Sequence, residues 1–375
     1  MPNPSLPNPR TWAANDLVSV PRLRADVANA VAFLAGRPMF AGQATNGGGI
    51  ANNTDTAVQM QAELVDSWNA HVTATSGSAT PSEVWAPVPG WYLCRNVQVF
   101  APTVAAAYPF AAGFQGIVNG AAYGPFRGGV VIGGFSSTYA AQCCDLIEQV
   151  VSGSPGGSGD YIQPTVWQQS GGAVALNSNT ALLPTASVRW VCATSGTQPL
   201  PIPPLTAVPS PITAAWLNGN VRDAVSFLCY PPVCKAYYTA GSATMANNTL
   251  GAPSVVPCNT VAVDNYGGWN ASTFTYTAPV AGIYFLYGQF ILTTQATATL
   301  YAAGLSVNGG AAQWGDIASF APASSVNGGA TVSRRLRLTA GQTVQLVGSQ
   351  QSGSAVAYAT SAVSQSRFIA VWDGA

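Results

Sequence analysis

The segment Trp269–Phe290, which reads WNASTFTYTAPVAGIYFLYGQF, is the clearest indication of how this chain folds. Within it, Thr273–Thr277 is rich in β-branched and aromatic residues, and a second such run extends from Ile283 to Leu292. Residues of these types fit a pleated, half-buried surface, and Pro and Gly residues separate the two runs. We therefore expect two consecutive β-strands joined by a turn.

The end of this stretch has an earlier counterpart, because Ala278–Phe285 (APVAGIYF) matches Ala86–Leu93 (APVPGWYL). Four further pairs match in the same order along the chain: Asp26–Pro38 with Asn220–Pro232, Ile50–Thr54 with Met245–Thr249, Ile117–Gly120 with Ser306–Gly309, and Asp160–Gly171 with Gln342–Gly353. Five collinear matches indicate an internal duplication. The difference in residue number between matched positions becomes smaller toward the end of the repeat. The first copy therefore carries an extra loop late in its sequence.

The duplication divides the chain into four parts. We expect an N-terminal segment with a short helix (residues 1–38), a first module (39–195), a Pro-rich linker with a second short helix (196–232) and a second module (233–375). The proline content of residues 194–213 predicts an extended, fairly stiff connector.

Each module is predicted to open with a helix and to continue as strands. A stripe at helical spacing marks the first helix (Leu23, Val27, Val31, Leu34) and another marks the second (Val221, Val225, Leu228). Further strands are predicted at Thr331–Leu338, Thr343–Gly348 and Arg367–Trp372. The fold class is therefore all-β, with two tandem antiparallel jelly-roll sandwich modules that each follow a short helix.

The second module resembles the jelly roll of the complement globular heads and tumour necrosis factor. The resemblance covers roughly residues 261–375 and rests on Trp269–Phe290, LSVNG (305–309), RLRLTAGQTVQLV (335–347) and RFIAVW (367–372). The residues that match the family pattern are Trp269, Phe274, Pro279, Gly282, Tyr284, Phe285 and Gly341. Through the internal repeat, Pro87, Gly90, Tyr92 and Asp160 carry the pattern into the first module.

This resemblance implies a ten-stranded jelly roll that forms homotrimers through an apolar face. Gln342 departs from the family, which usually has an acidic residue at that corner. If the acidic residue supports a loop or an ion site, the second module lacks that support.

The composition favours a protein that associates with copies of itself. Charged residues make up 7% of the chain, the net charge is zero and hydrophobic residues make up 48%; a typical soluble domain has about 25% charged residues. A surface so poor in charge tends to associate, although a neutral secreted domain kept soluble by Ser, Thr, Asn and Gln is the alternative.

The scattered basic residues argue against binding to nucleic acid, and Arg334, Arg335 and Arg337 are predicted to lie on a solvated strand face. The start lacks a secretory signal and no apolar run approaches a membrane span, so we expect no membrane insertion.

Candidate catalytic and metal-binding groups are few. The only histidine is His71, which we interpret as an ordinary strand residue, and the glutamates Glu63, Glu83 and Glu148 do not recur between the modules. The seven cysteines form no CxxC pair, so buried thiols are expected, although Cys229 and Cys234 could pair across the turn between them. We therefore expect no enzyme activity, no metal and no cofactor.

Two features remain as candidates for binding. The motif ANNT occurs twice, with Asn52, Asn53 and Thr54 in the first copy and Asn247, Asn248 and Thr249 in the second. A turn held by asparagine side chains is the simpler interpretation, and a displayed binding loop is the alternative. Exposed tryptophans could stack on a carbohydrate, the candidates being Trp91, Trp167, Trp269 and Trp314, although packing in the core is the simpler interpretation for most of them.

The leader before each module looks like those that precede such modules in minor virion proteins of phages infecting actinobacteria. This second resemblance implies a structural component of a bacteriophage virion, assembled in the bacterial host cytoplasm, whose partners are itself and other virion proteins. We favour a trimeric minor tail or baseplate protein with host-surface contact. The alternatives are a capsid decoration or head-fibre protein that stabilises the shell, and a carbohydrate- or receptor-binding module that recognises host cell-surface glycan.

Overall fold

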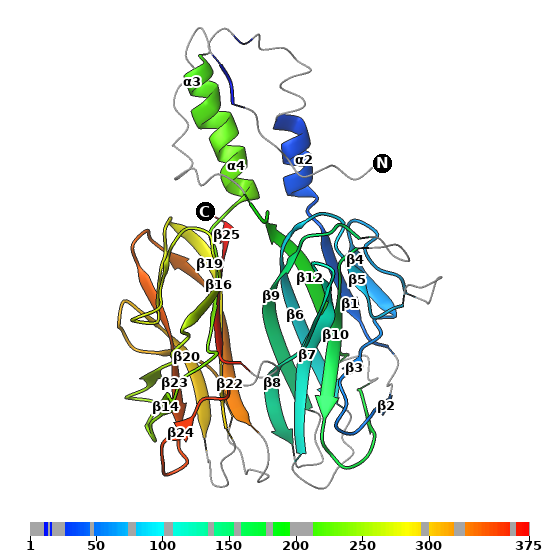
Figure 1. The fold of residues 1–375 in the computed structure, drawn as a ribbon, viewed down its shortest axis with the longest axis vertical. Helices are drawn as coiled ribbons and strands as arrows, with labels where there is room; N and C mark the ends of the chain where they lie inside the picture. Colours follow the sequence, from blue (N-terminus) through cyan, green and yellow to red (C-terminus); the bar gives the residue numbers. More distant parts are fainter. Residues whose placement is uncertain are drawn as a thin grey trace.

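The chain folds into two all-β blocks with helices at one end (Figure 1). The computed structural model describes residues 11–13, 16, 27–45, 49–73, 80–100, 108–133, 139–153, 159–177, 183–195, 213–293, 300–318, 327–360 and 365–374. Strands pair antiparallel throughout these residues, in two sets of stacked sheets. The predicted all-β sandwich fold is confirmed. Most of the N-terminal segment, including Leu23, and residues 196–212 of the linker lie outside the described residues.

The first module consists of two large sheets and one small one. The first large sheet has the order β4 (Ala62–Asp66), β1 (Met39–Gln43), β12 (Thr185–Cys192), β6 (Gly90–Phe100), β9 (Tyr139–Gln149). The second has the order β3 (Thr56–Ala57), β10 (Tyr161–Gln168), β7 (Tyr108–Val118), β8 (Ala121–Gly133), with β5 (Val84–Trp85) also paired to β10. β2 (Gly49–Ile50) pairs with β11 (Val174–Ala175). A continuous apolar core fills the space between the large sheets.

The second module repeats this arrangement. Its first large sheet has the order β16 (Thr260–Asp264), β13 (Val233–Tyr237), β25 (Arg367–Gly374), β19 (Gly282–Leu292), β22 (Gly328–Leu338). Its second has the order β17 (Trp269–Asn270), β18 (Thr275–Thr277), β23 (Thr343–Gln350), β20 (Tyr301–Val307), β21 (Gln313–Ala318), with β15 (Ser254–Val255) paired to β23. β14 (Thr244–Met245) pairs with β24 (Val356–Ala357). The strands predicted from the sequence lie within these elements, apart from residues 273–274, which precede β18.

The same contacts set the entry of β6 and β19 in the two modules. Gly90 begins β6 and Gly282 begins β19, and a Cβ atom at either position would overlap the indole of Trp190 or Trp372, respectively. Only glycine permits this close approach. Two residues after each glycine, a tyrosine hydroxyl donates to a backbone carbonyl oxygen. Tyr92 donates to Val88 O at 2.7 Å, and Tyr284 donates to Val280 O at 2.9 Å.

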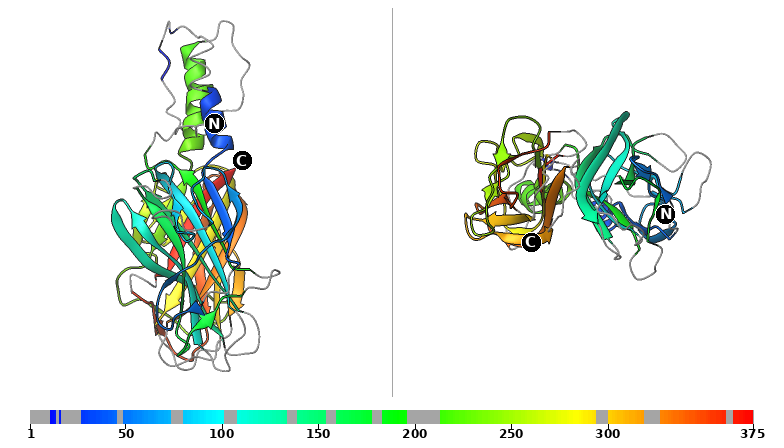
Figure 2. Two further views of the ribbon diagram at one scale, coloured as in Figure 1. Left: turned by 90° about the vertical axis from the view of Figure 1, so that its right-hand side faces the viewer. Right: turned by 90° about the horizontal axis from the view of Figure 1, so that it is seen from below.

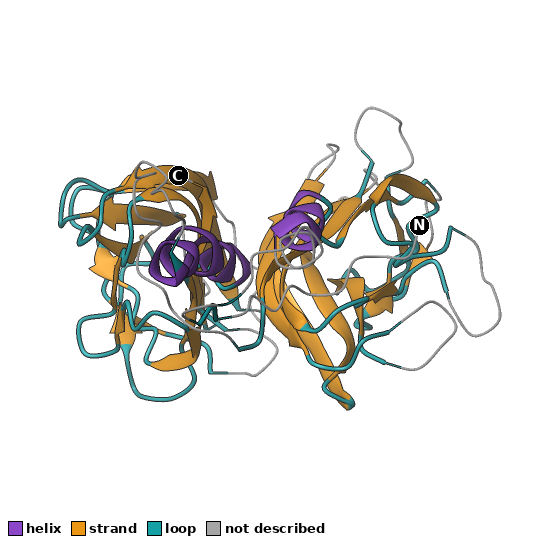
Figure 3. Cartoon of the chain, turned by 90° about the horizontal axis from the view of Figure 1, so that it is seen from above, coloured by secondary structure: helices purple, strands orange, loops and turns teal. Residues whose placement is uncertain are grey.

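The helices stand side by side at one end of the molecule (Figures 1 and 2). The first module is preceded by α2 (Asn29–Ala35), and the second by α3 (Ala214–Leu217), a π-helical turn η2 (Asn218–Arg222) and α4 (Asp223–Cys229) in succession. Seen from above, each helix lies over its own set of sheets (Figure 3). Within the described residues, no helix has the length and apolar character needed to cross a membrane.

The face of α2 that packs on the sheets differs from the prediction. Val31 was expected on the buried stripe, but its side chain is 55% exposed. Phe33 is buried instead and contacts the Trp190 ring edge-on, with 5.0 Å between ring centroids. In the second module, Phe227 of α4 makes the same contact with Trp372 at 4.9 Å. Burying a large aromatic ring against tryptophan outweighs the burial of a valine, so the phenylalanine sets the rotation of the helix.

Candidate functional site: the contact between the modules

The two modules meet through the outward faces of their five-stranded sheets. The first module contributes its β6–β9 margin and part of β12, and the second contributes the middle strands β13, β25 and β19. A shared apolar cluster joins them, made of Trp91, Leu93, Cys144, Leu146, Val191 and Cys192 from one side and Val233, Tyr287, Ile369 and Val371 from the other. β9 lies against β13 and β25, whereas β22, its counterpart in the second module, lies against β8. The equivalent strands β12 and β25 also meet, through Arg189 and Asp373. The contact therefore pairs β9 and β22 with different partners, although the modules are related.

A buried ionic cluster lies within this contact. Asp145 on β9 accepts from Lys235 Nζ on β13 at 2.6 Å, and Arg367 Nη1 on β25 lies 3.4 Å from its other carboxylate oxygen. Asp145 and Arg367 have fully buried side chains, and that of Lys235 is nearly so. The Tyr123 hydroxyl on β8 also donates to Asp145. One carboxylate of the first module therefore holds two cations of the second.

The environment keeps Asp145 ionised. Burial alone would raise the pKa of this carboxyl, but the charges of Lys235 and Arg367 outweigh burial and hold the pKa below its ordinary value. Both cations also donate to backbone carbonyl oxygens of β9: Lys235 to Leu146 at 3.0 Å and Arg367 to Cys144 at 3.4 Å. Removing one partner from such a buried pair costs about 3–5 kcal/mol, because the remaining charges stay buried and uncompensated.

Two further polar contacts cross the junction. Asp373 at the end of β25 accepts from Arg189 of β12 at 2.7 Å, and it also pairs with Arg335 of β22 in its own module at 3.0 Å. The buried Asn265 side chain accepts from Val233 N at 2.7 Å and donates to Cys192 Sγ of the first module at 3.5 Å. The modules are thus joined by polar contacts as well as by the apolar cluster.

The sequence reasoning singled out none of Asp145, Lys235 and Arg367. A signal was present, because Lys235 is the only lysine of the chain and stands in a predominantly apolar segment. Aligning the repeat strand by strand supplies a second signal: Asp145 pairs with Cys94 on β6, whereas at the equivalent place in the second module Arg334 pairs with Leu286 on β19.

The residues chosen from the family pattern lie at corners and strand starts. Pro87 and Pro279 lie in the turns before β6 and β19, which Gly90 and Gly282 begin. Phe274 and Gly341 have positive φ angles of 54° and 84° in turns. Trp269 stacks on Phe368 at 5.2 Å, and Tyr92 and Tyr284 are the core tyrosines described above. Phe285 packs against the apolar cluster between the modules and so is the one family residue that reaches the contact.

The acidic corner of the first module holds several backbone groups. The buried Asp160 carboxylate accepts from Asn119 N, Gly120 N, Val150 N and Val151 N at 2.7–3.3 Å. Gln342, at the same corner of the second module, accepts from Thr339 N at 2.9 Å. The acidic residue therefore supports loops in the module that has it.

Both ANNT motifs lie at the same kind of turn. Asn52 accepts from Gly171 N at 2.8 Å, and Asn247 accepts from Gly353 N at 2.9 Å. The next asparagine donates its backbone N–H to a carbonyl oxygen of the facing strand, Asn53 to Gln168 and Asn248 to Gln350. Thr54 donates back to Asn52 O, and Thr249 O accepts from Ala252 N. These bonds connect each motif to the end of β10 or β23; whether the loops also bind a ligand stays a prediction.

The candidate tryptophans have different surroundings. Trp91 and Trp167 are buried, the former in the contact between the modules, and Trp269 is half-buried on Phe368. Trp314 lines an open groove of the second module.

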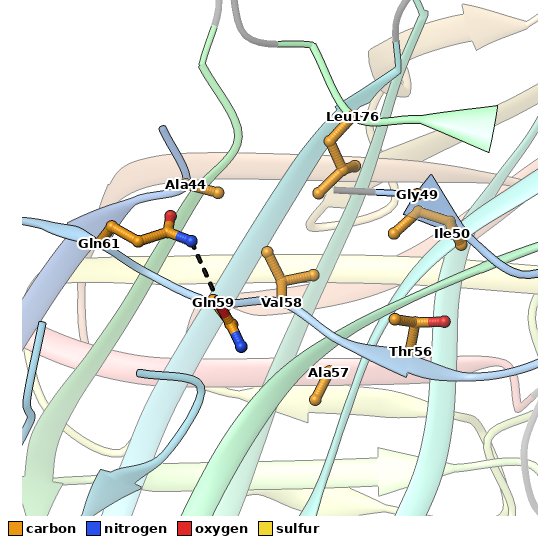
Figure 4. A pocket seen from close by; sticks show the side chains of 9 residues that line it. All are labelled: Ala44, Gly49, Ile50, Thr56, Ala57, Val58, Gln59, Gln61 and Leu176. Atoms are coloured by element: carbon orange, nitrogen blue, oxygen red, sulfur yellow. Dashed lines mark hydrogen bonds between the residues drawn. The ribbon is translucent and has the colours of Figure 1, made fainter. Parts of the chain in front are cut away.

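A cavity of about 310 Å³ opens in the first module among short aliphatic side chains and two glutamines (Figure 4). Its lining includes no ionisable group, so it offers no acid–base chemistry.

Of the candidate catalytic groups, the structure brings His71 and Glu63 together, and Glu148 lies apart from them on β9. His71 lies outside any strand, which corrects the prediction; it is buried, and its ring nitrogens lie 2.9 Å from Glu63 Oε1 and 2.8 Å from Pro81 O. These contacts hold the loop after β4. All seven cysteines are buried and free, so Cys229 and Cys234 do not form a disulfide. Burial raises the pKa of Cys229 to about 11 and that of Cys143 to about 12, which disfavours thiolate chemistry. Among the described residues, no three His, Cys, Asp or Glu side chains gather where they could hold a metal ion.

Comparisons with known proteins give weak likenesses. No protein-family model matches the chain, and no curated protein matches its sequence. Among solved structures, the globular domain of zebrafish complement 1qA protein is 11% identical, over 38% of this chain and 96% of that chain, with a TM-score of 0.28. Murine APRIL at pH 8.0 is 14% identical, over 40% of this chain and 98% of that chain, with a TM-score of 0.27. At these identities and TM-scores, neither structure carries an argument about function.

Proposed function

We propose that this chain is a non-catalytic structural component of a bacteriophage virion, a minor tail or baseplate protein that works as a self-associating building block. The observation that carries the building-block role is the contact between the modules. It joins two related sandwiches into one body whose two sides differ. The phage assignment rests on the resemblance of the leader segments, and the low charge of the chain supports an assembled state.

The contact leaves one margin of the first module's sheet open for association. β1 and β4 lie at the margin opposite β9, and they expose the apolar side chains of Met39, Leu64 and Val65, with Leu64 58% exposed. Adjacent exposed apolar side chains on a protein so poor in charge favour burial against another chain. A heterologous contact between chains that closes into a ring gives a cyclic oligomer, and the homotrimer is the ring size that the resemblance to the complement and tumour necrosis factor family implies.

Gold-labelled antibody against the chain, imaged on intact particles of the phage that encodes it, tests the placement. Label at the tail tip supports the tail or baseplate role. Label over the head replaces it with capsid decoration, and absence of label from purified particles contradicts a virion role altogether.

Light scattering of the purified chain tests self-association separately. We expect the mass of three chains for the wild type and a smaller species for Leu64→Lys. Val261→Lys is the matched control, because Val261 is exposed on β16, the corresponding strand of the second module, and this variant keeps the wild-type mass. A clean monomer for the wild type contradicts the building-block role.

A further inference from the structure

A groove crosses the outward face of the second module's six-stranded sheet. Its volume is about 440 Å³, within the range of small-molecule sites. The floor is formed by β23 and β20 through Gln345, Val347 and Ser306. One wall is the segment 250–255, and the other is the segment 309–314, which ends in Trp314. The groove therefore lies on the side of the sheet opposite the core.

Trp314 rests against Gly304 at the edge of the groove. It pairs with Gly304 across β20 and β21, and a Cβ atom at Gly304 would lie 3.0 Å from Cε3 of the indole. The absent side chain thus provides the space in which the ring rests. The indole remains half-buried, with part of its surface open to the groove.

The polar groups of the groove are held in place by the protein. The Gln345 amide nitrogen donates to Thr273 O at 3.1 Å and to Thr275 Oγ1 at 2.9 Å, which leaves its oxygen Oε1 as a fixed acceptor. Ser306 Oγ donates to Gly310 O at 2.8 Å and closes the loop that forms one wall. Asn248 of the second ANNT motif donates to Ser254 Oγ at 2.8 Å and supports the other wall. Fixed polar groups bind a ligand at a lower entropic cost than mobile ones.

The lining defines the chemistry of the ligand. The described residues that form the groove carry no formal charge. They combine one indole, one fixed amide, the aliphatic side chains of Leu250, Val255 and Val347, and small residues that expose the backbone. A ligand that matches them is neutral, has one apolar face for the ring and carries hydroxyl groups for the amide. We propose that this groove binds a neutral saccharide chain, with Trp314 as the stacking platform and Gln345 as the hydrogen-bond acceptor.

The described part of the first module does not repeat this site. At the same register, Gly113 on β7 pairs with Arg127 on β8, where the second module pairs Gly304 with Trp314. The first-module cavity of Figure 4 has no aromatic residue among its lining. Within the residues that the structure describes, the proposed saccharide site therefore belongs to the second module, and it does not depend on where the protein is placed in a particle.

Calorimetric titration of the full-length chain with maltohexaose, cellohexaose and chitohexaose tests the site. We expect saturable binding of at least one of these probes at one site per chain. The dissociation constant should not change with ionic strength, because no ion pair forms. Failure of all three probes to bind overturns the proposal, as does binding at two sites per chain or binding that weakens steeply with salt.

Variants identify the groove as the site. Trp314→Ala should weaken binding about tenfold, Gln345→Ala about threefold, and Trp314→Phe should retain most of it because a ring remains. Trp269→Phe is the matched control, since this half-buried tryptophan of the same module lies outside the lining, and it should bind as the wild type does. Gly304→Val, which displaces the ring without removing it, should weaken binding with little change in the unfolding transition. Wild-type affinity in Trp314→Ala and Gly304→Val overturns the proposal.

Discussion

The ends of β10 and β23 are built in the same way in the two modules. Gln168 donates to Ile50 O at 2.9 Å and to Gly172 O at 2.7 Å, and Gln350 donates to Met245 O at 3.1 Å and to Ser354 O at 2.7 Å. In both modules, a serine two residues later donates its backbone N–H to the glutamine oxygen. β9 and β22 also occupy equivalent places in their sheets, but β9 carries Asp145 and Glu148 where β22 carries Arg334 and Arg337.

This difference in charge shows how two copies of one module can come to bind each other in a single arrangement. The bonds at the ends of β10 and β23 are the same in the two copies, whereas the charges at the margins have opposite sign. Lys235 and Arg367 on the second module's face attract the Asp145 margin of the first. The same face would repel the Arg334 margin of another second module. The charges therefore favour one order of modules and disfavour a contact between two second modules.

The largest expected effect comes from neutralising the charge that distinguishes the margins. Asp145→Asn keeps the shape of the side chain but leaves Lys235 and Arg367 buried without a counter-charge. We expect the free energy of unfolding to fall by about 3–5 kcal/mol in chemical denaturation. Arg334→Gln is the matched control at the equivalent, exposed position, where the change should stay within about 0.5 kcal/mol. Equal losses in the two variants would contradict the asymmetry.

The second expected effect is the loss of this difference in acid. The folded-state pKa of Asp145 is lowered, so the carboxylate contributes stability above the unfolded-state value of about 3.9 and loses it as the pH falls through the folded-state pKa. The unfolding free energies of the wild type and Asp145→Asn should therefore differ most at neutral pH and converge below about pH 4. Denaturation curves between pH 7 and pH 3 measure this convergence. A gap of constant size down to pH 3 would show that no ionised carboxylate holds the contact.

A smaller effect separates the acidic corner from its neutral counterpart. Asp160→Asn replaces an acceptor of four backbone N–H groups by an amide that brings its own N–H groups, and should cost about 1–3 kcal/mol. Gln342→Ala removes one acceptor at a partly exposed position and should cost less than about 1 kcal/mol. Thermal unfolding of the two variants side by side measures the difference, and an equal cost would mean that the corner does not depend on charge.

The sequence predicted what local pattern determines and missed what packing determines. The strand expected at Ile283–Leu292 is observed as Gly282–Leu292, because its aromatic and β-branched residues favour the β conformation. The prediction of which face of α2 is buried was wrong, because the rotation of a short helix is set by the tryptophan that it packs against. The ionic cluster depends on partners far apart in sequence: Lys235 reaches a carbonyl oxygen 89 residues away and Arg367 one 223 residues away. No window of sequence contains that contact, and only comparison of the two copies points to it.

The smallest expected effect concerns the asparagines that the two modules share. Asn52→Ala and Asn247→Ala each remove one hydrogen bond to a backbone N–H at an exposed turn, with bond lengths of 2.8 and 2.9 Å. Each should lower the free energy of unfolding by about 1 kcal/mol, and because the two bonds are equivalent, the two losses should be equal. Chemical denaturation of the two single variants measures this. If the second loss is clearly the larger, the turn beside the groove of the second module has come to depend on its asparagine more than its counterpart does. The modules would then differ in their turns as well as at their margins.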